Sequence, residues 1–351
     1  MTGSAAGTGV TPETPVARVP VPRQAPGGPG RRRESGPVSP PVLLGVLLVA
    51  ALVVASQAGA LDSERVRAWC TVLLAIVLAA TPFLVLGVTV SGLIAAYVPS
   101  GAFTRLLPSD RRLAVPAAGL AGAALPGCEC SSVPVAGRLI ERGAPAAAAL
   151  TFMLAAPAIN PVVVVATFVA FPGMPEVAAA RFAASLLAAT AVGLLWLRVG
   201  RAVAVRGASP EPGAPSTDRG RVFTETAGHD FLHAGGYLVL GAALAATLQV
   251  VVPRSVLDSL AGIGWLAVLA LAVLAVILAI CSEADAFVAA GLSQFSLTAR
   301  LVFLVVGPMV DVKLVALQVG TFGRAFALRF APLSFVCAVV SAVAVATVVG
   351  L

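Results

Sequence analysis

Long runs of apolar residues recur from about residue 42 to the C-terminus, and short polar stretches separate them. A helix that spans a bilayer needs about 20 apolar residues, and several of these runs are that long. The runs cover residues 42–60, 69–98, 113–126, 146–171, 177–199, 231–252, 263–281, 299–322 and 327–350. The pattern predicts an all-α polytopic membrane protein with about eight or nine hydrophobic segments, because the strands of a membrane β-barrel would give short alternating runs instead.

Composition supports this class, since 59% of the 351 residues are hydrophobic and 11% are charged. Residues 1–40 differ: they are rich in Pro, Gly and Arg, which predicts a disordered cytoplasmic tail. The run Arg31–Arg33 precedes segment 42–60, so this segment is expected to be an extra N-terminal helix with its arginines in the cytoplasm. Cleavage of 42–60 as a signal peptide is the alternative.

Residues 200–230 form a second hydrophilic stretch, rich in Pro, Gly, Ser, Thr and Arg, and are expected to be a cytoplasmic linker. It divides the membrane part into a first half, 41–199, and a second half, 231–351. The halves are similar: Cys130-Ser131 recurs as Cys281-Ser282, 151 residues later. The same spacing relates Phe152 to Phe303, Pro157 to Pro308, Asn160 to Asp311 and Phe171 to Phe322, while 83–87 resembles 237–241 at a spacing of 154. Repeats on this scale are typical of transporters.

The placement of arginines bears on the topology. If every segment crossed the membrane, the arginine-rich linker would lie outside, against the positive-inside rule. If 113–126 instead enters and returns through 128–140 as a re-entrant hairpin, the arginine-containing loops all become cytoplasmic. Each half then has three full crossings and one broken element, which makes the halves inverted repeats. Segment 263–281 is long enough to span outright, and this leaves the full crossing as an alternative.

Polar residues interrupt the apolar pattern at two related places, around residues 126–134 and 281–285. Ionisable groups at bilayer depth are costly and mark candidate functional sites. Thiolates are soft ligands that favour copper(I), zinc and, by the same softness, trivalent arsenic or antimony. We therefore expect a substrate site that draws on Cys128, Glu129, Cys130, Ser131, Asn160, Cys281, Glu283, Asp285, Asp311 and Lys313. Loop residues at helix ends are the simpler alternative.

Prolines predict where helices break next to these residues, because each removes an intrahelical hydrogen bond. The predicted breaks lie at Pro126, Pro134, Pro157, Pro161 and Pro308. Lys313 is the only lysine, and a buried lysine can lose its proton more readily than an arginine. Once the helix is broken, Asp311 and Lys313 can pair with each other, or either can pair with Glu283 or Asp285. Two interpretations stay open: a proton-coupled step that uses these groups, or a static ion pair that locks the halves.

Other candidates are weaker. His229 and His233 are four residues apart, a spacing that helical zinc sites use, but they stand at the start of a membrane segment. Cys70 and Cys337 are interpreted as small buried hydrophobic residues. The chain has no phosphate-binding loop or hydrolase motif, so we expect neither an enzyme nor a cofactor. The net charge of +7 is expected to set topology rather than to bind nucleic acid.

The motifs around these residues resemble a known family. Cys128-Glu-Cys130, the following stretch to Asn160-Pro161, Cys281-Ser-Glu-Ala-Asp285 and Gly307-Pro-Met-Val-Asp-Val-Lys313 are similar to the predicted-permease family that includes the ArsP-type organoarsenical efflux permeases. The resemblance covers about residues 42–351 and implies a multi-spanning permease of the inner (plasma) membrane. In the ArsP type a membrane-embedded cysteine contacts the substrate, a role that would fall on Cys128 or Cys130. Ser131 departs from the glycine usual there.

That pattern looks closer to uncharacterised permeases of the family, some of which look to be partnered with a second small membrane subunit that is associated with zinc homeostasis. The leading hypothesis is a secondary permease that exports a soft, thiol-reactive solute, such as a trivalent organoarsenical, through a site between the two halves. A permease for zinc or another divalent metal, bound by carboxylates, is the first alternative. A membrane scaffold without transport activity is the second. Beyond the substrate, the expected partners are the lipid bilayer and a second membrane subunit.

Overall fold

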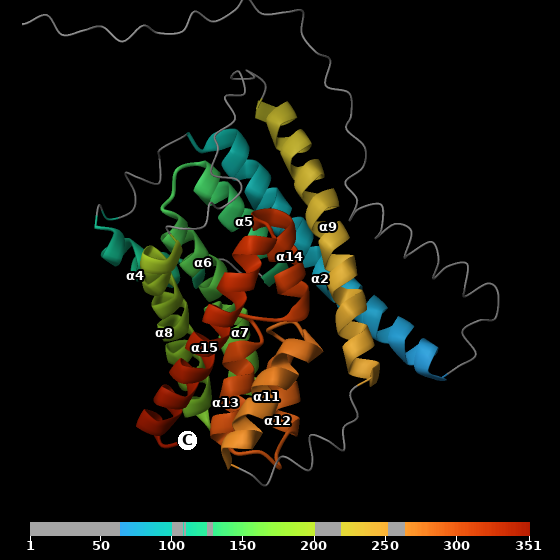
Figure 1. Ribbon diagram of the computed structural model, residues 1–351, viewed down its shortest axis with the longest axis vertical. Coiled ribbons are helices and arrows are strands. Elements are labelled where there is room, and N and C mark those ends of the chain that lie inside the picture. Colours follow the sequence, from blue (N-terminus) through green and yellow to red (C-terminus); the bar gives the residue numbers. More distant parts are fainter. Residues whose placement is uncertain (1–63, 100–107, 109, 125–128, 201–218, 252–263) are drawn as a thin grey trace, which may run out of the picture. The chain divides into compact units, whose positions relative to one another are not determined.

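The computed structural model describes residues 64–99, 108, 110–124, 129–200, 219–251 and 264–351, all of which belong to the unit Val38–Leu351. Within these residues every regular element is a helix (Figure 1). The helices are α2 (Glu64–Tyr97), α4 (Arg111–Gly122), α5 (Glu129–Glu141), α6 (Ala146–Ile159), α7 (Pro161–Ala170), α8 (Pro175–Val199), α9 (Arg219–Val251), α11 (Gly264–Leu278), α12 (Asp285–Gly291), α13 (Leu297–Val306), α14 (Val312–Phe322) and α15 (Arg324–Val349). The predicted tail 1–40, helix 42–60, Pro126 and Cys128 lie outside the described residues.

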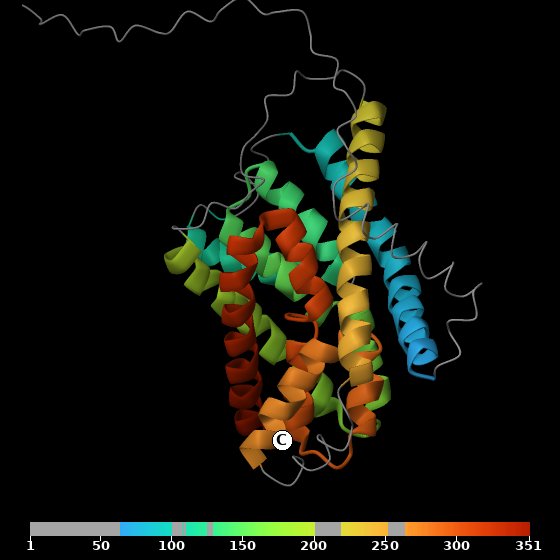
Figure 2. The ribbon, with the colours of Figure 1, turned by 45° about the vertical axis from the view of Figure 1, so that its right-hand side comes forward.

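The helices of the two halves correspond in order: α2, α4, α5, α6, α7 and α8 are followed by α9, α11, α12, α13, α14 and α15. Corresponding long helices pack together in opposite directions (Figures 1 and 2). Trp69 near the start of α2 donates to Thr247 near the end of α9, and Trp196 near the end of α8 stacks edge-on against Phe326 near the start of α15. The antiparallel pairs are the arrangement expected of inverted repeats.

Four stretches of helix are long and apolar enough to cross a membrane: Glu64–Tyr97, Ala146–Ala170, Pro175–Arg198 and Arg324–Val349. Helices α4 and α5 have 12 and 13 residues. At 1.5 Å per residue each is only about 20 Å long, against roughly 30 Å of hydrocarbon, so neither crosses alone. Helix α11 ends at Leu278 after 15 residues, so a single helix does not cover segment 263–281.

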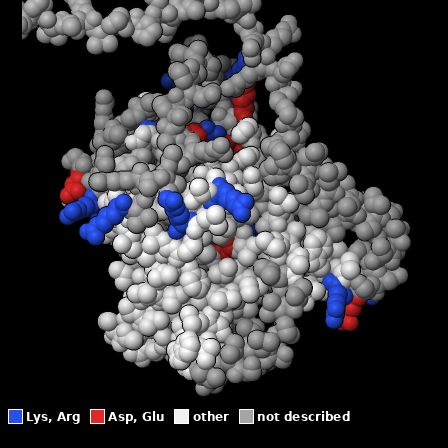
Figure 3. Space-filling model, viewed as in Figure 1, with Lys and Arg blue, Asp and Glu red and all other residues white. Residues whose placement is uncertain are grey.

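The described surface fits a lipid environment. On the face drawn in Figure 3, most charged side chains lie in a band across the upper half and in one group at the lower right, and a small acidic patch shows near the centre. Helix α15 exposes large apolar side chains, among them Leu328, Val336 and Val340. The exposure of apolar side chains below the charged band is what a membrane-embedded protein requires, because lipid rather than water contacts that surface.

Two predictions about element boundaries are wrong. Residues 219–230 of the predicted linker form the first three turns of α9. An ion pair between Arg221 and Glu225, one turn apart at 2.7 Å, supports the helix there. Pro134 and Pro157 lie inside α5 and α6 and do not end them. Both prolines are buried among neighbouring helices, and such packing tolerates a missing backbone hydrogen bond.

The breaks predicted at Pro161 and Pro308 are present. Pro161 is the first residue of α7, where its missing N–H removes no helical bond. Pro308 lies in the turn between α13 and α14. The continuous segments 146–171 and 299–322 are therefore each two helices in succession, interrupted within the protein rather than at its surface, since Asn160 and Asp311 at the breaks are 0% exposed.

The repeated Leu-Val-Leu-Gly motif marks two helix crossings. A Cβ on Gly87 of α2 would lie 2.5 Å from the Ser131 Cα of α5, and a Cβ on Gly241 of α9 would lie 2.6 Å from the Lys313 Cα of α14. Both neighbours are backbone atoms, which cannot rotate away. Glycine is therefore required at each crossing because the helix axes approach closely.

Gly241→Ala is expected to destabilise the protein by about 1–3 kcal/mol, because α9 must move away from α14 to accept a methyl group. Gly228→Ala on the same helix is the matched control, since nothing lies within 4 Å of its added Cβ. This control should be neutral or stabilising by up to about 1 kcal/mol. Thermal midpoints of the two purified variants in detergent check the prediction. Equal midpoints would contradict the close crossing.

Candidate functional site

The two helix breaks carry related polar residues. Asn160 precedes α7, and its Oδ1 accepts a hydrogen bond from the Val163 N–H at 2.9 Å. Asp311 precedes α14, and its Oδ1 accepts from the Leu314 N–H at 2.5 Å. The repeat spacing predicted this pair, and the structure gives it a shared role as N-caps. Each cap places a buried polar side chain at the N-terminus of a half-length helix, where backbone N–H groups favour negative charge.

A buried ion pair connects the halves beside Asp311. The Lys313 Nζ contacts Glu129 Oε1, and both side chains are 0% exposed. The same ammonium donates to the Ala279 carbonyl at 3.0 Å and lies 3.6 Å from Asp311 Oδ2. Two carboxyl groups therefore share one lysine. The prediction that Lys313 can pair with Asp311 holds only at this longer distance, and Glu129 is its close partner.

A second buried ion pair also connects the halves. Arg181 of α8 donates to Asp285 Oδ2 at 2.8 Å, to the Ser282 carbonyl at 3.1 Å and to the Thr167 hydroxyl at 2.8 Å. Arg181 is 1% exposed and Asp285 is 2% exposed. The prediction that Asp285 can pair with Asp311 or Lys313 is wrong, because the α8 arginine holds it.

Sequence reasoning missed Arg181. Its signal was present, since it is a charged residue five positions inside the apolar segment 177–199. Ionisable residues inside such segments face partners rather than lipid.

The thiols also gather from both halves. Cys130 of α5 is buried, and Cys281, which precedes α12, is half-buried. Both are close enough to interact electrostatically with the Lys313 ammonium. Ser131 packs against the α2 crossing at Gly87. Cys337 is buried within α15, as expected of a packing residue, whereas Cys70 on α2 is only half-buried.

Negative charge exceeds positive charge in this region. Four carboxyl groups interact electrostatically with two cations, and the participants are Glu129, Glu283, Asp285, Asp311, Arg181 and Lys313. Glu283 is half-buried and the others are almost completely buried. Such an excess requires protons or a bound cation, because unpaired buried charge is expensive. Within the described residues, no three His, Cys, Asp or Glu side chains are grouped so that they could hold a metal ion.

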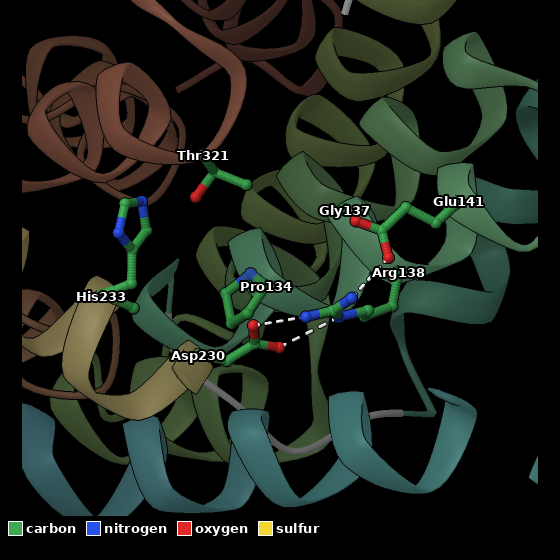
Figure 4. A pocket seen from close by; sticks show the side chains of 8 residues that line it. Pro134, Gly137, Arg138, Glu141, Asp230, His233 and Thr321 are labelled. Carbon is green, nitrogen blue, oxygen red and sulfur yellow. Dashed lines mark hydrogen bonds and ion pairs between the residues drawn. The ribbon is translucent and has the colours of Figure 1, made fainter. Parts of the chain in front are cut away.

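The two histidines belong to a separate cluster, and Figure 4 shows His233, Asp230 and Arg138 of it. Their rings stack with centroids 5.8 Å apart, and His233 Nε2 lies 3.0 Å from the Gly320 carbonyl. Arg138 of α5 holds both carboxylate oxygens of Asp230 at 2.6 and 3.1 Å. Burial opposes the ionised form of Asp230, but the neighbouring His229 at 3.6 Å and hydrogen bonds from Arg138 and Ser91 outweigh it and lower its pKa to about 2. Asp230 is therefore ionised at neutral pH and joins the two halves.

A cavity of about 60 Å³ lies beside this cluster. Its lining comes from three helices, α5, α9 and α14, and consists of Pro134, Gly137, Arg138, Glu141, Asp230, His233, Ala234 and Thr321 (Figure 4). The lining includes no thiol. The cavity is therefore distinct from the thiol-containing region at the helix breaks.

Comparison with known proteins decides the family. The model of the ArsP_1 family, described as predicted permease, matches residues 66–349. The chain belongs to this family. The permease is 33% identical over 263 residues to the UPF0718 protein YcgR of Bacillus subtilis, covering 73% of this chain and 89% of that protein. It is 32% identical over 266 residues to the "Putative two-component membrane permease complex subunit" of Streptococcus mutans, covering 74% and 88%. No solved structure is significantly similar.

Membership of this family agrees with the geometry. A permease needs a polar site within an apolar protein, and irregular backbone at membrane depth is tolerated only where protein or a cavity surrounds it. The permease meets this condition with two interrupted helices whose caps, Asn160 and Asp311, are fully buried. Its family points to a transporter of the membrane rather than to an enzyme.

Proposed function

We propose that this permease is a secondary transporter of the plasma membrane that exports a small, soft, thiol-reactive solute, such as a trivalent organoarsenical. The observation that supports it is that Cys130 from the first half and Cys281 from the second half both lie within electrostatic range of one ammonium group, that of Lys313. A thiolate, rather than a thiol, is the soft ligand, and a nearby cation favours the thiolate. A site shared between halves can open to either side as the halves rock against each other.

The proposed binding chemistry is an exchange of ligands on arsenic. Methylarsenite carries two hydroxyl groups, and each As–S bond that forms breaks one As–OH bond. The proton that each thiol loses on becoming a thiolate combines with the hydroxide that leaves arsenic, so two thiols release two waters and no net proton. The reaction reverses when water enters the site, which allows the solute to be released.

Access to the site requires that contacts between the halves change. The Arg138–Asp230 pair joins α5 to α9 at the end of the protein where α9 begins. The side chain of Arg138 is 21% exposed and that of Asp230 is 10% exposed. Separating this pair therefore costs less free energy than separating the fully buried pairs. We infer that this contact closes the cytoplasmic end. A second membrane subunit is part of the proposal, because a relative is named as a subunit of a two-component complex.

A divalent metal such as zinc is the second candidate substrate. The observation that favours it is the excess of four carboxyl groups over two cations around Lys313 and Arg181. Carboxylates prefer harder cations than thiolates do. In this alternative the carboxylates hold the cation, and the thiols can be replaced without loss.

The test is accumulation of solute in inverted membrane vesicles, with methylarsenite and zinc offered separately. Cys130→Ser and Cys281→Ser should each reduce methylarsenite accumulation by at least about tenfold, which corresponds to the loss of 1.4 kcal/mol of binding. Cys337→Ser is the matched control, because this thiol is buried in α15 away from the breaks. Methylarsenite accumulation that survives both substitutions contradicts the thiol site, and thiol-independent zinc accumulation supports the metal alternative. Movement of neither solute supports the scaffold.

A further inference from the structure

We propose that the carboxyl group of Asp311 is the proton-binding site that couples export by this permease to the proton gradient. The proposal rests on the proposed function, since it names the coupling ion for the same site. The site binds one proton when it is empty and releases it when the solute binds. Export of solute is then exchanged for entry of a proton.

Geometry selects Asp311 from the buried carboxyl groups. The Lys313 ammonium has three donors: one goes to the Ala279 carbonyl and one contacts Glu129. Asp311 Oδ2 lies 3.6 Å away, which is too long for a hydrogen bond, and it has no hydrogen-bond partner among the described residues. Asp285 is held by Arg181, and Glu283 is only half-buried. Asp311 is thus the fully buried carboxyl group without a close cation of its own.

The equivalent residue of the first half shows that this position accepts a neutral side chain. Asn160 caps α7 through Oδ1, and its Nδ2 donates to the Ala156 carbonyl at 3.1 Å. A protonated aspartic acid has the same shape and the same pattern, with one acceptor oxygen and one donor group. Asp311 can therefore keep its cap to Leu314 in both protonation states. The repeat holds a fixed neutral cap in one half and a cap that can change its charge in the other.

A proton and the solute compete for the same negative charge. With Asp311 protonated, Lys313 and Glu129 form a neutral pair. With Asp311 ionised, the group of three carries one net negative charge in a buried place, which is costly unless something electropositive is near. An arsenic atom bound to thiols next to Lys313 is electropositive. Because thiol exchange releases water and no net proton, the proton must come from another group, and Asp311 is placed to supply it.

Other ionisable groups on the elements around α14 lie elsewhere. On α9, His233 contacts the Gly320 carbonyl, near the end of α14 opposite to Asp311. Arg324 and Arg329 are exposed on α15. The groups on the surrounding elements are Glu129, Cys130, Arg138 and Glu141 on α5, Arg219, Arg221, Glu225, His229, Asp230, His233 and Tyr237 on α9, Arg324, Arg329 and Cys337 on α15, and Cys281 before α12. Of these, Glu129 is the one that acts on the ionisation of Asp311, together with Lys313 on α14 itself.

The experiment uses the full-length permease in proteoliposomes with methylarsenite as the probe. Two rates are measured: exchange of labelled for unlabelled methylarsenite at equal pH, and net uptake driven by an imposed pH gradient. Asp311→Asn should lose the stimulation by the gradient, because asparagine keeps the N-cap but cannot bind or release a proton. Glu225→Gln, an exposed carboxyl group on α9 that is far along the chain from the site, is the control and should keep both rates.

A second measurement is proton release on binding of methylarsenite to the purified permease in weakly buffered solution. Wild type should release about one proton per solute bound, and Asp311→Asn should release none. Asp311→Ser, which also caps a helix, replaces the asparagine variant if that variant does not fold. Two outcomes would overturn the proton site but leave the proposed function standing. Wild type could exchange methylarsenite without any stimulation of net uptake by the pH gradient, or Asp311→Asn could keep the full stimulation. Absence of exchange in wild type contradicts the proposed function itself.

Discussion

Lys313→Met is expected to destabilise the folded permease by about 3–5 kcal/mol and to abolish transport. The substitution leaves Glu129 and Asp311 without their common cation, in a region where both side chains are 0% exposed. Removing one partner of a buried pair leaves an uncompensated charge, and this cost exceeds what the intact pair contributes. The Ala279 carbonyl also loses its donor. The thermal midpoint in detergent and the yield of monodisperse protein measure the effect.

The matched control is Lys313→Met combined with Glu129→Gln. The double variant removes the carboxylate of Glu129, the close partner that the single variant leaves without a cation, so part of the lost stability should return. Transport should not return, because the ammonium beside Cys130 and Cys281 is still missing. Equal stability of the single and double variants would show that Lys313 does not act as the cation for Glu129.

The sequence was informative wherever a rule depends on neighbours in the chain. Proline chemistry located the breaks next to Pro161 and Pro308, and the repeat spacing paired Asn160 with Asp311. Both are local properties: a missing N–H and a polar side chain within a few residues. The same reasoning gave the wrong result for Pro134, because whether a helix tolerates proline depends on what packs around it.

Partners distant in sequence could not be predicted in this way. Lys313 pairs with Glu129 and Asp285 pairs with Arg181, and each partner lies more than 100 residues away. Several carboxyl groups were equally good candidates for the one lysine, and nothing in their spacing separates them. Only the packing of α5 against α14, and of α8 near α12, selects the pairs.

The Arg181 and Lys313 ion pairs differ in the number and kind of their hydrogen-bond acceptors. This difference suggests a structural role for the first pair and a transport role for the second. Arg181 is fixed by three acceptors, namely Asp285, the Ser282 carbonyl and Thr167. Its planar guanidinium presents its donors in a rigid fork and reaches all three at once. Lys313 has one carbonyl and two carboxyl groups that compete for it. We therefore interpret the Arg181 pair as a fixed connection and the Lys313 pair as the one that responds to the solute.

Arg181→Met is accordingly expected to destabilise the permease by about 3–5 kcal/mol, since Asp285 at 2% exposure loses its cation and the Ser282 carbonyl loses a donor. Arg181→Met combined with Asp285→Asn should recover most of the stability and also most of the transport, because a neutral pair of similar volume still connects the halves. Thermal midpoints and methylarsenite accumulation in inverted vesicles measure the two effects together. If stability recovers while transport stays lost, Arg181 takes part in transport, and the distinction between the two pairs is wrong.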